Sequence, residues 1–184
     1  MKPGMAILLL SLTPAWCQLA KPAALTSSNL PAPKAARIPL GAIRDLERTF
    51  NGRLSAMAGA DQPTELMGDT RGVQLEDYGV VFTAELSLVI TPGLMPGRPT
   101  IPPEMAARVK VQRMERMPLL REAMKGMMRD MATALAQLPA SQQLVLVVRL
   151  YYGAWEDTTG MPAQVLVRAN RANAAVGKVE TEER

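Results

Sequence analysis

The order of the predicted elements indicates an α+β fold, a small and mainly antiparallel sheet packed against helices. Residues 80–90 show the period-2 alternation of a strand, residues 143–152 have the β-branched and aliphatic composition of a central strand, and one long amphipathic segment separates the two strand pairs. Strands that follow one another along a chain usually pair, so the order hairpin, long helix, hairpin predicts a sheet of about four strands. With 184 residues, 48% of them hydrophobic, the chain is long and apolar enough for one core.

The first 17 residues have the features of a cleaved export signal. Lys2 precedes a short apolar run at residues 6–12. Ala15 and Cys17 then supply small residues at the −3 and −1 positions of a cut before Gln18. The apolar run is much shorter than the ~20 residues that span a bilayer. We therefore expect an exported protein, periplasmic or extracellular, with no transmembrane span after cleavage.

A lipid anchor on Cys17 is the alternative interpretation of the same segment. Trp16 argues against it, because lipoprotein signals place a small residue before the lipidated cysteine. We therefore expect no lipid anchor. Cleavage would also remove the only cysteine of a chain that has no histidine.

A single domain is predicted over residues 38–177, after a linker at 18–37 that is rich in Ala, Pro and Ser. The domain begins with a helix over 40–58, between Pro39 and Gly59. Five apolar side chains share one face of this helix: Ile43, Leu46, Phe50, Leu54 and Met57.

A hairpin is predicted over residues 71–90, with a turn that ends at Gly79 and strict alternation from Val80 onward. The next segment, residues 92–103, contains five prolines and predicts an extended connector.

The longest predicted helix covers residues 104–138. The apolar face of its second half consists of Met117, Leu120, Met124, Met127, Met128, Met131, Leu135 and Leu138. In the first half of the helix, Arg113 lies on the same face as these apolar residues, whereas Val111 and Met114 lie on other faces. Because Pro118 stands at the change, we expect a kink or two consecutive helices.

The second hairpin is predicted from a central strand at 143–152, a loop at 153–162 and a strand at 163–169. Asn170 predicts the N-cap of a short helix that ends at Gly177. The charged residues 178–184 predict a frayed tail.

The composition excludes several classes of enzyme. Without histidine there is no Ser-His-Asp or Cys-His catalysis and no His-ligated zinc. The GxSxG, SxxK, GxGxxG and Walker A patterns are absent as well. Two adjacent carboxylate pairs, Glu76-Asp77 and Glu156-Asp157, leave a carboxylate-dependent hydrolase as an alternative, although turn stabilisation is the better interpretation. The sequence disfavours an enzyme and gives no catalytic residue.

Methionine is the most unusual residue type, because seven methionines lie between residues 105 and 131. Soft thioethers select Cu(I), which makes an extracytoplasmic copper protein an alternative function. Its candidate ligands are Met114, Met117, Met124, Met128 and Met131. Core packing is the better interpretation, because most of these methionines share their helix face with leucines.

The remaining candidate site is the aromatic group Tyr151, Tyr152 and Trp155, either a binding interface or, the preferred interpretation, a cap over the end of the sheet. Six aromatics in the mature chain are too few for a base-stacking surface, so we expect no nucleic acid partner. The acids of residues 61–85 are expected to face the cations of the long helix. We therefore predict an exported, non-catalytic binding or scaffolding module of the cell envelope, with a protein partner and no cofactor.

Overall fold

The computed structural model describes residues 37–59, 63–91 and 101–184 of the chain. The predicted signal peptide, nearly all of the linker and most of the proline-rich connector lie outside the described residues. The elements follow the order α1 (Leu40–Ala56), β1 (Glu65–Leu66), β2 (Arg71–Leu75), β3 (Gly79–Ser87), α2 (Pro103–Ala134), β4 (Gln143–Leu150), β5 (Gln164–Asn170), α3 (Arg171–Ala175) and β6 (Glu180–Glu183).

The strands form one mixed sheet with β3 and β4 at its centre. These two strands run parallel, with Val80 opposite Leu144, and every other pairing is antiparallel. β1 and β2 pair with successive parts of β3, while β5 and β6 extend the sheet beyond β4. The α+β class with a mainly antiparallel sheet is confirmed, but the sheet has six strands rather than about four. The central pair is parallel because α2 returns the chain to the end of the sheet where β3 began.

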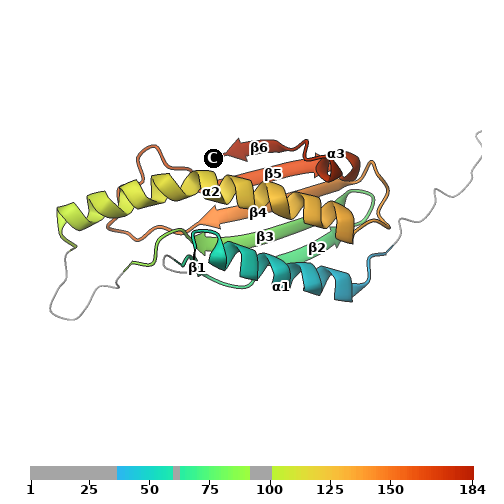
Figure 1. Cartoon of the computed structure of the whole chain (residues 1–184), viewed down its shortest axis with the longest axis horizontal. Coiled ribbons are helices and arrows are strands. Elements are labelled where there is room, and N and C mark those ends of the chain that lie inside the picture. Colours follow the sequence, from blue (N-terminus) through green and yellow to red (C-terminus); the bar gives the residue numbers. More distant parts are fainter. Residues whose placement is uncertain (1–36, 60–62, 92–100) are drawn as a thin grey trace, which may run out of the picture. The chain divides into compact units, whose positions relative to one another are not determined.

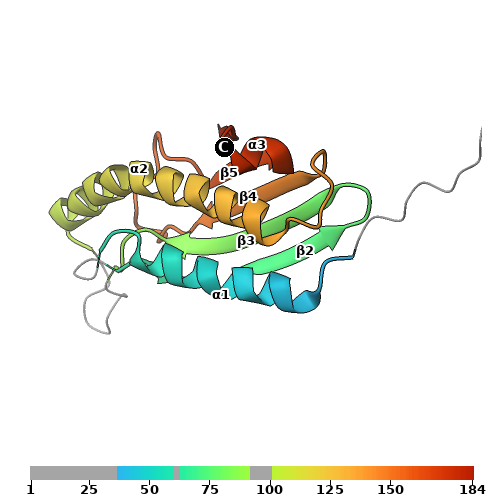
Figure 2. The same cartoon turned by 45° about the vertical axis from the view of Figure 1, so that its right-hand side comes forward.

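Both long helices lie on the same face of the sheet (Figures 1 and 2). Phe82, Leu146 and Val167 are in register across β3, β4 and β5 and are completely buried beneath the helices. Phe50 of α1 meets Phe82 edge to face, with the ring centroids 5.2 Å apart. In the described part of the chain the opposite face of the sheet has no helix over it (Figure 2).

α2 is one helix of 32 residues, with Pro118 inside it. The alternative of two consecutive helices is therefore wrong. Proline donates no hydrogen bond to the carbonyl of Met114, and its ring crowds that carbonyl, so a bend is expected here. Figure 1 shows α2 as a curved helix.

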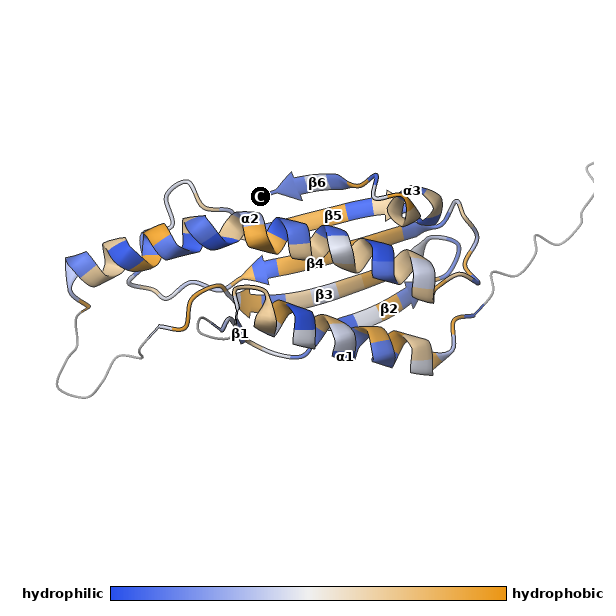
Figure 3. Ribbon diagram, in the orientation of Figure 1, coloured by the Kyte–Doolittle hydropathy of each residue, from blue (hydrophilic) through white to orange (hydrophobic). Residues whose placement is uncertain are grey.

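The C-terminal residues form a strand, so the prediction of a frayed tail is wrong. β6 pairs with β5, and Val167 lies opposite Thr181. β6 carries three glutamates. Figure 3 shows it as a hydrophilic edge of the sheet, whereas β3, β4 and β5 are largely apolar. Acidic side chains on an edge strand discourage pairing with another chain.

The charges of α2 are compensated by a different part of the chain than expected. The prediction that the acids of residues 61–85 face these cations is wrong for the described residues. The cations of α2 instead form ion pairs with the β4–β5 loop and with β6: Lys110 with Asp157, Arg113 with Glu156, and Arg121 with Glu183. These contacts hold both C-terminal segments against α2.

Candidate functional site

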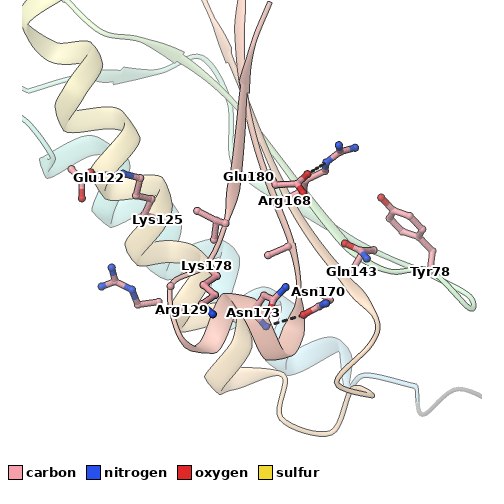
Figure 4. Close-up of a pocket in the computed structure, with 13 residues that line it drawn as sticks. Tyr78, Glu122, Lys125, Arg129, Gln143, Arg168, Asn170, Asn173, Lys178 and Glu180 are labelled. Atoms are coloured by element: carbon pink, nitrogen blue, oxygen red, sulfur yellow. Dashed lines mark hydrogen bonds and ion pairs between the residues drawn. The ribbon is translucent and has the colours of Figure 1, made fainter.

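A groove of about 980 Å³ lies at the end of the sheet where α3 lies (Figure 4). Its walls come from α2, from the end of β5, from α3 and the turn that follows it, and from the beginnings of β4 and β6. The lining residues are Tyr78, Glu122, Lys125, Arg129, Gln143, Arg168, Ala169, Asn170, Asn173, Gly177, Lys178, Val179 and Glu180.

Local hydrogen bonds fix the floor of this groove. Asn170 caps α3 by accepting a hydrogen bond from the backbone N–H of Asn173, at 2.8 Å, as the sequence predicts. At the other end of α3, Gly177 adopts a φ of +75° and donates to Ala174, while the N–H of Lys178 donates to the carbonyl of Asn173. This pair of bonds is a Schellman motif, which turns the chain sharply from α3 into β6. Its geometry fixes the backbone from which Lys178 projects.

The absence of a side chain at Gly177 leaves room for the guanidinium of Arg129, which projects from α2. A Cβ atom at position 177 would lie 3.1 Å from Nε of Arg129. The guanidinium therefore rests directly over the glycine, and a larger residue there would displace it.

The groove carries a surplus of positive charge. Four of its lining side chains are cations and two are carboxylates, which gives 4 − 2 = +2. Lys125 binds Glu122 at 2.7 Å, and Arg168 binds Glu180 at 2.9 Å. The hydrogen bond from Lys125 lowers the pKa of Glu122, and the hydrogen bond to Glu180 raises the pKa of Arg168.

The remaining two cations of the groove, Arg129 and Lys178, are exposed, and neither side chain forms a hydrogen bond or an ion pair with another described residue. Arg129 acts on Glu122 only through its longer-range charge. The surplus charge of the groove therefore belongs to these two side chains.

A second polar cluster is buried at the opposite end of the sheet. Arg113, only 1% exposed, binds Glu156 through Nη2 at 2.7 Å and lies 5.0 Å from the ring centre of Tyr152. Glu156 also accepts a hydrogen bond from the N–H of Gly153, at 2.8 Å. Burial raises the pKa of Tyr152, whose hydroxyl donates to the carbonyl of Pro162. This cluster fastens the β4–β5 loop to α2.

The two candidate carboxylate pairs do not face each other. Glu76 and Asp77 precede β3 in the turn from β2, whereas Glu156 and Asp157 lie beyond the end of β4. Because β3 and β4 are parallel, the two pairs lie at opposite ends of the sheet, roughly 26 Å apart along β3. A glycosidase needs its two carboxylates within about 10 Å.

The five candidate copper ligands do not share one site, because four of them are buried and the fifth is exposed to solvent. Met117 is buried at 4% exposure, and the side chains of Met124, Met128 and Met131 are completely buried in the core between α2 and the sheet. Met114 lies on the outward face of α2, 59% exposed. No group of three or more Cys, Asp or Glu side chains in the described residues is arranged to hold a metal ion.

The aromatic cluster predicted from the sequence is divided as well. Tyr152 and Trp155 are half-buried and pack against the core at the end of the sheet. Tyr151 remains 46% exposed. The predicted cleavage residues, Cys17 and Gln18, lie outside the described residues.

The sequence did not predict the groove, and it named Tyr152 and Glu156 as candidates without joining them to Arg113. The groove cations stand far apart in the sequence, and no local pattern joins Arg129 to Lys178. The buried cluster did leave a signal, because Arg113 occupies an apolar direction of its helix. None of the described helices is long and apolar enough to cross a membrane.

The fold and the groove define an α+β protein with a two-layer core and a basic surface groove. Comparison of the chain with protein-family models, with curated proteins and with solved structures finds no match.

Proposed function

We propose that the protein is an exported, non-catalytic binding module whose basic groove holds an anionic segment of a partner protein. The observation that carries the proposal is the pair of cations, Arg129 and Lys178, that line the groove without an ion pair to a described residue. Their charge has no counterpart among residues 37–59, 63–91 and 101–184, so it is available to a ligand.

The form of the groove favours an extended ligand over a small molecule. Its volume of about 980 Å³ is at the upper end of the range for small-molecule sites, and it is open to solvent along the molecule's surface (Figure 4). Exposed amides and hydroxyls at Asn173 and Tyr78 line it beside the cations. Carboxylates spaced along a peptide match such a row of donors, because charge-assisted hydrogen bonds are the strong polar contacts at an exposed surface.

The proposal is tested by titrating the purified protein with hexaglutamate in a calorimeter, with hexaglutamine as the neutral probe. We expect hexaglutamate to bind with a Kd that rises with salt concentration, and hexaglutamine not to bind, because the attraction is electrostatic and screened. The double variant Arg129→Ala/Lys178→Ala is expected to weaken hexaglutamate binding by at least about tenfold, since it removes both unpaired cations.

The control variant is Arg44→Ala/Arg149→Ala, which removes two exposed arginines outside the groove that also form no ion pair with a described residue. It changes the net charge by the same amount and should leave the affinity within about twofold. If both double variants lose the same affinity for hexaglutamate, then net charge alone explains the binding, and the groove is not the binding site.

Export is the second component of the proposal, and it rests on the charge, apolar run and small residues at positions 2–17. We expect the intact mass of the secreted protein to correspond to a chain that begins at Gln18. A mass that retains Cys17 with an added lipid would replace the free form with a membrane-anchored one. Retention of the whole segment inside the cell would contradict export.

A further inference from the structure

The outward face of the N-terminal half of α2 carries an apolar stripe that the described part of the chain leaves exposed. Ala107, Val111, Met114 and Pro118 follow one another at intervals of four, three and four residues. At about 100° per residue their directions fall within a wedge of about 60°. All four are exposed, with Val111 at 55% and Met114 at 59%.

The stripe is not the face by which α2 packs on the sheet. That face is formed in the same half of the helix by buried residues such as Val109 and Arg116, which point in nearly the opposite direction. The intervals along the stripe are those of alternating a and d positions in a coiled coil. An amphipathic surface helix normally carries polar residues on its outward side, so an exposed apolar seam indicates a helical partner.

We propose that this stripe binds the same stripe of a second copy of the chain, with the two α2 helices antiparallel about a two-fold axis. The axis passes between Val111 and Met114. Val111 then packs against Met114 of the second copy, and Ala107 packs against Pro118 of the second copy, each contact occurring twice.

The charges along one edge of the stripe fit this arrangement. Arg108 and Glu115 lie on the same edge, both are exposed, and neither forms a hydrogen bond or ion pair through its side chain with a described residue. Antiparallel pairing places Arg108 beside Glu115 of the second copy and Glu115 beside Arg108 of the second copy. A parallel pairing would instead bring Glu115 toward Lys110, which is already bound to Asp157.

The stripe is short, about 17 Å from Ala107 to Pro118. An interface of this length lies at the low end of the size range for specific complexes, so we expect a weak, reversible dimer with a Kd of micromolar order or above. This dimer is independent of the basic groove, because none of its residues lines that groove.

The dimer is tested by sedimentation velocity of the purified protein from about 1 to 300 µM. We expect a concentration-dependent monomer–dimer equilibrium. Val111→Ser/Met114→Ser should abolish it over this range, because it removes the central apolar contacts of both copies. Leu40→Ser/Val176→Ser is the control, since these side chains are equally exposed, at 59% and 70%, and lie outside α2. It should leave the equilibrium unchanged.

The orientation is tested by charge reversal. Arg108→Glu alone places like charges together twice in the antiparallel dimer and should weaken it about tenfold at low salt. Arg108→Glu/Glu115→Arg restores both pairs and should return the Kd to within about threefold of the wild-type value. A protein that stays monomeric at the highest concentration would overturn the proposal. A dimer that tolerates Val111→Ser/Met114→Ser, or that is not restored by the double charge reversal, would overturn it too.

Discussion

Arg113→Ala is expected to lower the free energy of unfolding by about 3–5 kcal/mol, measured by chemical denaturation. The substitution leaves the carboxylate of Glu156 buried, 5% exposed, without its cation. Truncation of one partner of a buried ion pair is costly because the remaining charge keeps its desolvation penalty and loses its compensation. The control is Arg129→Ala, which removes an exposed arginine of the same helix. It should change the free energy of unfolding by no more than about 0.5 kcal/mol.

The double substitution Arg113→Met/Glu156→Leu separates the contribution of the buried charges to stability from the contribution of side-chain packing. It removes both charges while retaining side chains of similar volume, so most of the stability lost in Arg113→Ala should return. If Arg113→Ala costs less than about 1 kcal/mol, then the β4–β5 loop is not held by this pair.

Gly79→Ala is expected to destabilise the protein by about 4 kcal/mol or more, or to prevent folding altogether. Gly79 begins β3 with a φ of +143°, and a Cβ atom there would lie 1.8 Å from the carbonyl oxygen of Gln143. This oxygen belongs to the backbone of β4. Because the N–H of Gln143 donates to the carbonyl of Tyr78 at 2.8 Å, the backbone of Gln143 cannot move without disrupting the parallel pair of β3 and β4. The measurement is the yield of folded protein, followed by its thermal midpoint.

Gly160→Ala is the matched control for this substitution. Gly160 also has a positive φ, +77°, but no atom lies within 4 Å of the position of its Cβ. It should therefore show the backbone cost alone, about 1 kcal/mol. Equal effects at the two glycines would show that the contact between β3 and β4 is not the cause.

The elements that the sequence predicted well are those whose own residues carry the pattern. α1 buries Ile43, Leu46, Phe50 and Leu54 as its periodicity predicts, and β3 alternates as expected through Leu86. The short α3 was also predictable, because both Asn170 and Gly177 give local capping signals.

The elements that were missed depend on partners elsewhere in the chain. β6 has no apolar alternation, and its glutamates are held by Arg168 and Arg121 from β5 and α2. The orientation of β3 against β4 follows from the route of the crossover helix, not from either strand alone. The groove has the same origin, since Lys178 lies beside α2 because α3 packs against α2 and the Schellman turn follows α3.

Chemical-shift mapping of the purified protein during hexaglutamate titration shows whether an anionic segment binds between α2 and the turn after α3. We predict that the largest changes occur at the backbone amides of Gly177 and Lys178 and at the side chain of Arg129. They should disappear in Arg129→Ala/Lys178→Ala and persist in Arg44→Ala/Arg149→Ala. Changes centred elsewhere, or none at saturating peptide, would show that the basic groove is not the binding site.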